Sequence, residues 1–200
     1  MPRCKICKNK FEAKYFLQKT CFEPSCIISF KDLVQQKEWN ERKKKLKIEL
    51  YPKETKKALQ IEINKLVRLI DAKFGYTCID CNKPYGKQVD AAHYTSVGSN
   101  DTIRFHLDNI HSADSYCNNY KNTHILDYYE GLISRYGKEY AEYVKNELPR
   151  HKKIKLMSNE VHEKTTLVRK IIRDFDTFNF SNSLEARSIL NGIIGIYEKK

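Results

Sequence analysis

The stretch NIHSADSYCNN, residues 109–119, places amide, imidazole, carboxylate and thiol side chains close together in the chain. It contains one cysteine, Cys117, although the upstream pair Cys78 and Cys81 needs two partners to hold a tetrahedral zinc ion. The 35 residues between Cys81 and Cys117 are too many for a compact zinc ribbon, but they leave room for a strand, a loop and a second strand. The stretch therefore predicts a turn from a strand into a helix, at which two sites meet.

The segment around it, residues 76–121, lacks helical periodicity. Its predicted elements are, in order, a turn at NKPYG (82–86), a short strand at QVDAAHYT (88–95), a Gly/Ser/Asn loop at 98–100, a second strand near RFHLDNIH (104–111) and a helix from Cys117 or Asn118. The middle of the chain thus predicts two strands followed by a helix.

Helical periodicity dominates the flanking segments. After Thr55, a predicted N-cap, apolar residues recur on one helical face as far as Phe74, and Gly75 ends the helix. Amphipathic helices are also predicted within 126–150 and 159–178, and SNS at 181–183 has the composition of a cap for a last helix. We therefore predict a mostly helical α+β chain with these parts: a small zinc-binding module at 1–30, a basic linker and helix at 31–75, a ββα-metal core with a structural zinc site at 76–125, and C-terminal helices at 126–200.

Four cysteines near the N-terminus follow the pattern Cys4-x2-Cys7-x13-Cys21-x4-Cys26. The segment has too little apolar content for a core of its own, and a tetrahedral zinc would supply the missing folding energy. Four thiolates leave no open coordination position, so the role of this zinc would be structural. The alternative is four unliganded core cysteines, which paired spacing disfavours.

The chain is basic, with 37 Lys and Arg against 25 Asp and Glu, a net charge of +12 and a pI near 9.3. Such an excess favours a polyanionic partner, because neutralised phosphates release counterions; the alternative is a basic surface that only keeps the protein soluble. The run from Lys37 to Lys57 is predicted to be a linker helix that touches phosphate or is simply solvated. MPRCKICKNK lacks the apolar region of a signal peptide and no long apolar run follows, so we expect a cytoplasmic protein without a membrane partner. Free cysteines suit the same reducing compartment.

Polar side chains concentrate between positions 90 and 121. A His at the end of a strand, an Asn sixteen residues later, and Cys-Asn opening a helix with a Lys soon after form the pattern of a ββα-metal site, in which two strands and a helix hold a divalent cation against a phosphodiester. The residues concerned are Asp90, His93, Asp108, Asn109, His111, Asp114, Asn118, Asn119 and Lys121.

In this region the chain resembles a known family. RLIDAKFGYTCIDCN, VDAAHY, RFHLDNIH, CNNYK and LISRYGKE occur in the order of the phage NinG family, also called Rap, and RCKIC is similar to the family's N-terminal start. The similarity extends from about residue 3 to about residue 175. Members of this family are recombination endonucleases of the HNH type, so the resemblance implies metal-dependent cleavage of branched DNA, such as Holliday junctions and D-loops, in a phage-infected bacterial cell.

Within that resemblance, His93 is the predicted general base, because a neutral imidazole with a pKa near ~6.5 can accept a proton from water. Asp90 and Asn118 are the predicted ligands of a catalytic Mg²⁺ or Mn²⁺, which prefers oxygen donors. The cation would stabilise the leaving 3′ oxygen and the charge on the phosphorane.

Three further residues have less defined roles. Asn109 corresponds to the middle Asn of the HNH name, where its amide oxygen fixes the His ring or joins the metal shell. Lys121 contacts a phosphate or is an ordinary surface lysine. His111 is a ligand of the catalytic metal, a ligand of zinc or a group that supports such ligands.

Two positions depart from the HNH pattern. Many HNH sites carry Asp or His directly before the base, whereas position 92 is Ala and Asp90 lies three residues before His93. An odd offset points two side chains to opposite faces of a strand, so convergence would need a bulge or a sharp turn. The pattern also expects a cysteine where Asp114 stands. A structural zinc held by Cys78, Cys81, Cys117 and Asp114 is chemically sound, with His111, a water, or no zinc at all as the alternatives.

The chain is thus expected to hold one or two structural zinc ions and to cut DNA. A non-catalytic, zinc-bearing DNA-binding accessory protein with a degenerate HNH site would explain the same charge and cysteines, and an RNA-acting nuclease is a third reading. Symmetric cutting of a four-way junction would need two active sites, which favours a homodimer formed through the C-terminal helices.

Overall fold

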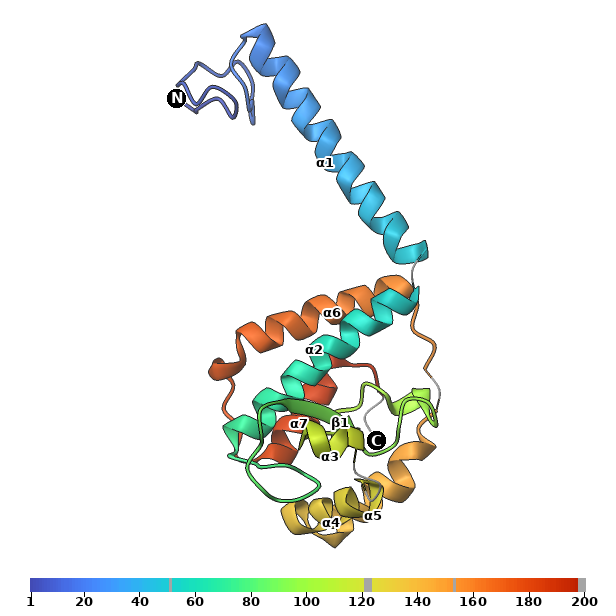
Figure 1. The fold of residues 1–200 in the computed structure, drawn as a ribbon. Helices are drawn as coiled ribbons and strands as arrows, with labels where there is room; N and C mark the ends of the chain where they lie inside the picture. The colour runs from blue at the N-terminus through green and yellow to red at the C-terminus, as the bar shows by residue number, and fades with distance from the viewer. Residues whose placement is uncertain (51, 121–123, 153, 198–200) are drawn as a thin grey trace. The chain divides into compact units, whose positions relative to one another are not determined.

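The structure, a computed structural model, describes residues 1–50, 52–120, 124–152 and 154–197, without the side chains at 50, 52 and 53. The chain forms two compact units, Met1–Tyr51 and Pro52–Lys200. The predicted mostly helical α+β class is confirmed (Figure 1). No helix in the described ranges has the length and apolar character needed to cross a membrane.

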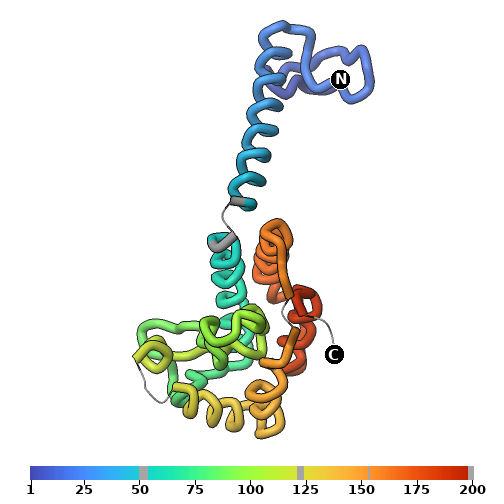
Figure 2. The backbone as a smooth tube through the Cα atoms, turned by 90° about the vertical axis from the view of Figure 1, so that its right-hand side faces the viewer, coloured from blue at the N-terminus to red at the C-terminus, as the bar shows by residue number. Residues whose placement is uncertain are grey.

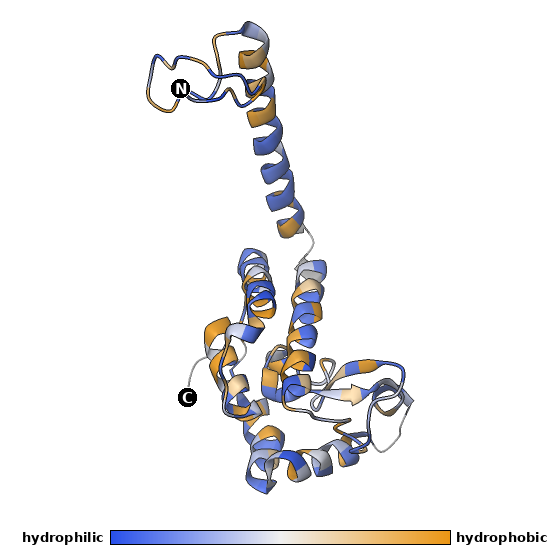
Figure 3. Ribbon diagram, turned by 90° about the vertical axis from the view of Figure 1, so that its left-hand side faces the viewer, coloured by the Kyte–Doolittle hydropathy of each residue, from blue (hydrophilic) through white to orange (hydrophobic). Residues whose placement is uncertain are grey.

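The first unit contains the four N-terminal cysteines and one long helix, α1 (Pro24–Leu50). Its buried cluster consists of Cys4, Phe11 and Cys26, with Ile6 and Cys21 packed against it. Cys26 is the buried residue of α1, and the helix is exposed from Lys31 to Lys47. The middle of α1 is coloured as hydrophilic in Figure 3. The basic run predicted as one linker helix from Lys37 to Lys57 is helical as far as Leu50 in α1 and again from Pro52 in α2, and residue 51 lies outside the described residues.

The second unit contains the sheet and the remaining helices. In order these are α2 (Pro52–Lys73), β1 (Val89–His93), β2 (Ile110–Asp114), α3 (Ser115–Tyr120), α4 (His124–Tyr136), α5 (Lys138–Glu142), α6 (Ser158–Arg173) and α7 (Ser183–Ile194). Short 3-10 turns lie at Asp101–Ile103, Leu107–Asn109, Leu148–Arg150 and Phe175–Thr177, and a π turn lies at Tyr143–Glu147. In Figures 1 and 2, α2 and α6 lie side by side.

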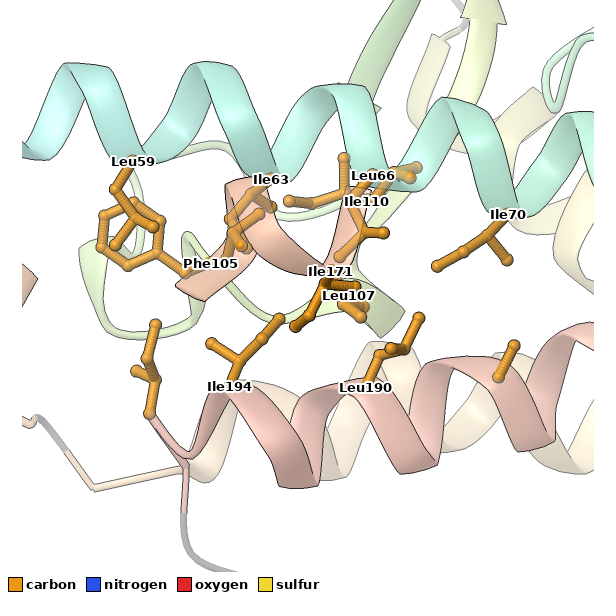
Figure 4. Packing of buried hydrophobic residues seen from close by; sticks show 14 of the residues in the cluster. Leu59, Ile63, Leu66, Ile70, Phe105, Leu107, Ile110, Ile171, Leu190 and Ile194 are labelled. Carbon is orange, nitrogen blue, oxygen red and sulfur yellow. The ribbon is translucent and has the colours of Figure 1, made fainter. Parts of the chain in front are cut away.

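The two strands separate two apolar cores. Ala91 and Ile110 pack into the first core, which joins α2, α6 and α7. Figure 4 shows this core, with α2 facing Leu190 and Ile194 of α7. On the other side of the sheet, Ala92 and Ala113 belong to a second core with the helices from α4 to the turn at Leu148. The sheet is therefore held between helices, which fixes the hairpin that carries the polar residues.

Several predicted boundaries need correction. The helix expected to follow Thr55 begins earlier, at Pro52, whose fixed φ suits a first helical turn. The strand expected at 104–111 begins at Ile110, because side chains upstream bond the backbone locally and form turns instead: His106 Nδ1 accepts from the Asp108 NH at 3.3 Å. The helix expected across 126–150 is interrupted at Gly137, where φ is +90°. The cap at 181–183 is confirmed, since Asn182 Oδ1 accepts from the Glu185 NH.

Candidate functional site

The candidate site is built on the β1–β2 hairpin and on α3, which follows β2 without a break. The strands are antiparallel, and Asp90 pairs with Ala113 while His93 pairs with Ile110. This register runs from Val89 to His93 without a bulge, so the sharp distortion that would bring the two side chains to one face is absent from the described ladder. Asp90 and His93 therefore point to opposite faces of β1.

One ring nitrogen of His93 is hydrogen-bonded to the backbone. Its Nε2 lies 2.9 Å from the backbone oxygen of Arg104, which can only accept, so Nε2 carries the proton and Nδ1 is the basic nitrogen. Burial, with a smaller contribution from the Arg104 charge, lowers the pKa of His93 below 6.5, although the bond to the Arg104 carbonyl opposes that shift. The imidazole is therefore neutral at pH 7 and can accept a proton.

Asn109 braces the loop that leaves β1. Its Oδ1 accepts from the Thr95 NH at 2.9 Å, and its Nδ2 donates to the Thr95 oxygen at 3.0 Å. The side chain is fully buried, and the backbone oxygen of Asn109 accepts from the Tyr94 NH. The amide thus fixes the chain two residues beyond His93 through the backbone.

Asp90 is surrounded by amide donors. Its Oδ2 accepts from Nδ2 of Asn118 at 3.1 Å and from Nδ2 of Asn119 at 2.9 Å, and its Oδ1 accepts from Gln88 at 3.2 Å. Burial alone would raise the pKa of Asp90, but these amides outweigh it and lower the pKa below its ordinary value. The predicted pair of Asp90 and Asn118 is thus brought together, and Asn119 joins it.

A carboxylate and two amides fit a hard cation. Each asparagine uses Nδ2 toward Asp90, and a half-turn of the amide presents Oδ1 instead, an exchange that leaves the shape of the side chain unchanged. The donor set is therefore suited to Mg²⁺ or Mn²⁺ and is separate from the thiols.

His111 lies away from this cluster, in the second core. Its Nδ1 is 2.9 Å from the Tyr128 hydroxyl, which donates to the Ala92 oxygen at 3.1 Å. The ring is fully buried, and burial holds the pKa of His111 well below its ordinary value. His111 is therefore packed inside the second core, where its ring is not exposed to solvent. Lys121 lies outside the described residues.

Cys78, Cys81 and Cys117 form one group, with their sulfur atoms all within 4.8 Å of one another. The turn that holds the first two closes when the Asn82 NH donates to the Cys78 oxygen at 3.0 Å, with Asn82 at a φ of +57°. Burial and the neighbouring thiols raise the pKa of Cys117 to about 12. A divalent cation would remove this penalty by stabilising the thiolates, so the group fits zinc.

Asp114 contacts the three-thiol group through its backbone NH. Its NH donates to Cys78 Sγ at 3.1 Å, while its carboxylate accepts from the Tyr116 NH at 2.9 Å and from the Gly86 NH at 2.6 Å. The first of these carboxylate bonds caps α3. The carboxylate is not a member of the three-thiol group. Asp114 as a fourth zinc ligand remains a prediction that needs a rotation of this side chain.

The N-terminal thiols of Cys4, Cys7, Cys21 and Cys26 also lie within 4.8 Å of one another. Burial and the other three thiols raise the pKa of Cys26 to about 12. Four converging sulfurs in a segment with so small an apolar cluster fit a tetrahedral zinc. The cysteine clusters of both units could therefore hold zinc.

The last helix positions the segment between the strands. Arg187 on α7 is fully buried; it donates to the backbone oxygens of Leu107 and Ile110 and to Asp71 Oδ1 at 2.7 Å. Asn191 Oδ1 accepts from the Leu107 NH at 3.1 Å. Tyr197 adds two contacts to the same segment: its hydroxyl donates to the Thr102 oxygen and accepts from the Phe105 NH.

These contacts fix residues 102–110, which carry Asn109 and the Arg104 carbonyl that orients His93. Sequence reasoning missed them, because arginine side chains are usually exposed and the partners of Arg187 lie far away in the chain. A polar residue in the apolar face of that helix, at the place of a core residue, was the available signal.

A family model described as Bacteriophage Lambda NinG protein matches residues 1–177. Neither the curated proteins nor the solved structures contain a match. The matched residues include all seven cysteines and both strands, and they end before α7.

Proposed function

Because the chain belongs to the bacteriophage lambda NinG family, we propose that it is a metal-dependent DNA endonuclease of the HNH type that cuts branched recombination intermediates, such as Holliday junctions and D-loops. The observation that carries this proposal is a pair of side chains on β1. A neutral His93 with a fixed Nε2 and an ionised Asp90 held by the amides of α3 come from one strand. Because the two side chains point to opposite faces of β1, the proposal requires a local twist of this strand when DNA binds, so that both reach one phosphodiester.

In the proposed reaction, His93 Nδ1 takes a proton from water as the water oxygen bonds to phosphorus. The bond from phosphorus to O3′ breaks, and the leaving oxygen gains a proton, so the products are a 5′-phosphate and a 3′-hydroxyl. The Arg104 carbonyl stabilises the imidazolium that forms, because it accepts from Nε2. Mg²⁺ or Mn²⁺ held by Asp90 and Asn118 would stabilise charge on the phosphorane and on the leaving oxygen.

The charge distribution supports a nucleic acid substrate. Residues 52–200 contain 24 Lys and Arg against 19 Asp and Glu, and residues 1–51 contain 13 against 6. Both units are thus basic. We expect affinity for DNA to fall steeply between ~50 and ~200 mM salt, whereas a flat response would assign the basic run of α1 to solvent alone.

The test is cleavage of linear, forked and four-way DNAs in Mg²⁺ or Mn²⁺. The wild type should nick the branched molecules, and His93→Ala should bind them without nicking. His162→Ala, which removes a partly exposed histidine from α6, is the matched control and should keep full activity. Absence of cleavage by the wild type with either cation would refute the enzyme proposal.

The second candidate is a non-catalytic accessory protein that binds branched DNA with a degenerate site. The opposite orientations of Asp90 and His93 on an unbulged β1 favour it, since these two side chains cannot meet at one phosphodiester without rearrangement. Binding without nicking by the wild type would support this candidate. Equal or better cleavage of structured RNA would instead favour an RNA-directed enzyme.

A further inference from the structure

α3 exposes two stacked tyrosines beside the candidate site. Tyr116 and Tyr120 are 67% and 74% exposed, and their rings stack with centroids 5.9 Å apart and planes 30° from parallel. They lie four residues apart, so they share one side of the helix. Cys117, between them, turns inward to the three-thiol group and anchors the helix.

These tyrosines belong to a concentration of exposed apolar side chains. Within the described part of the second unit, five large apolar side chains are more than 60% exposed, and four of them come from residues 116–126. The four are Tyr116, Tyr120, Ile125 and Leu126; the fifth is Met157. The two stacked tyrosine rings expose aromatic surface together, which costs solvation free energy and indicates a surface that binds a partner.

The tyrosine side of α3 adjoins the side that faces Asp90. Asn119, whose amide donates to Asp90 Oδ2 at 2.9 Å, follows Tyr116 by three residues and directly precedes Tyr120. At about 100° per residue, its direction lies between the tyrosines and Asn118. A strand with its phosphate at Asp90 would therefore bring neighbouring bases to the rings.

We propose that Tyr116 and Tyr120 stack on unpaired or unstacked bases and so give the protein its preference for branched over linear DNA; this inference rests on the proposed function, which places a strand at Asp90. Aromatic rings stack on any base, so such a contact needs no sequence preference. Base faces are covered in a continuous duplex and become accessible where strands exchange or separate. The basic charge of the chain supplies affinity for both forms, and the rings discriminate between them.

The experiment compares the affinities of the full-length protein for a four-way junction and for a linear duplex of equal length, at one salt concentration and without divalent cation. The double variant Tyr116→Ala/Tyr120→Ala should lose junction affinity by about 5- to 150-fold, the range for one base stacked on an aromatic ring, and keep its affinity for the duplex. The double variant to Phe keeps both rings and should keep the preference. Tyr15→Ala, which removes a 65% exposed tyrosine from the first unit, is the matched control.

Zinc content and circular dichroism of each variant verify that α3 remains anchored. An unchanged ratio of junction to duplex affinity in the Ala double variant would overturn the proposal, as would a wild type without any preference. An unchanged ratio together with lost self-association would assign the tyrosines to a protein interface. If the wild type fails to cleave but the Ala double variant loses the preference, the nuclease proposal falls and this one stands.

Discussion

The side chain of Asn118 on α3 donates to Asp90 Oδ2 on β1 at 3.1 Å. This bond joins α3 directly to β1, although β2 lies between them in the sequence. Cys117, the preceding residue, belongs to the three-thiol group. One short helix thus couples the candidate zinc group to the candidate cation site.

Asp90→Asn keeps the shape of the side chain and removes its charge. If Asp90 holds the catalytic cation, single-turnover cleavage of a four-way junction in Mg²⁺ should fall at least about 100-fold, because charge stabilisation of the phosphorane is lost. The zinc content should not change. Asp176→Asn, at an exposed carboxylate after α6, is the control. Full activity of Asp90→Asn would remove Asp90 from the site.

The pH dependence of cleavage should report the protonation of the partly buried His93. The base is active when neutral, so the rate should rise with pH through the pKa of His93 and then level off. Since burial holds that pKa below 6.5, the half-maximal rate is expected below pH 6.5. Cleavage rates at saturating Mn²⁺ across pH 5 to 8 provide the measurement. A half-maximum above pH 7 would point to a different base.

Substitutions of Asp114 separate its two roles. Asp114→Asn keeps an oxygen acceptor for the Tyr116 NH, so α3 stays capped, and zinc retention against a chelator should be unchanged if the carboxylate is not a ligand. Asp114→Cys supplies a fourth thiolate and should slow zinc loss. Elemental analysis should give about two zinc ions per chain when both cysteine groups are filled. Loss of one zinc in Asp114→Asn alone would identify the carboxylate as a ligand.

Arg187→Met should destabilise the second unit by up to about 3–5 kcal/mol, because the buried carboxylate of Asp71 loses its closer partner and keeps only Arg135, at 3.8 Å. Urea denaturation measures the change. Adding Asp71→Asn should recover part of the loss, since it removes that charge. Arg173→Met is the matched control: its ion pair with Asp174 is exposed and is worth about 0–1 kcal/mol. Equal effects of the two arginine substitutions would contradict this role for Arg187.

Chelation should unfold the N-terminal cysteine segment and leave the first core, between α2, α6 and α7, intact. Zinc binding would provide most of the folding free energy there, because the buried cluster holds so few apolar residues. Hydrogen exchange can follow the amides of Cys4 and Phe11, which bond the oxygens of Asn9 and Pro2. Their protection should disappear with chelator while that of Ile110 persists. Unchanged protection would favour a segment that folds without metal.

Local patterns predicted much of this structure. The apolar face from Leu59 to Ile70 identified α2, because a period near 3.6 residues is sufficient to mark a buried helical side. The thiol groups followed from cysteine spacing. The opposite orientations of Asp90 and His93 followed from strand parity, and the bulge that their convergence would need is absent from the described ladder.

Contacts between distant residues were beyond such reasoning. Asp114 could be assigned to zinc by position, but its carboxylate bonds two backbone NH groups whose location depends on the folded loop at Gly86. Arg187 contacts carbonyls 77 and 80 residues earlier in the chain. No local pattern identifies such partners, since they are selected by the packing of α7 against α2.

The contacts that α7 and Tyr197 make with residues 102–110 also affect when the candidate site can form during synthesis of the chain. His93 is synthesised long before Tyr197, and at translation rates of about 5 to 20 residues per second the interval is roughly 5 to 20 seconds. Late in that interval the strands and cysteines of a nascent chain have been synthesised, but residues 102–110 are not yet held by Arg187, Asn191 and Tyr197. The ribosome-bound chain therefore carries an unfinished site, and the order of synthesis delays its completion until the last helix has folded.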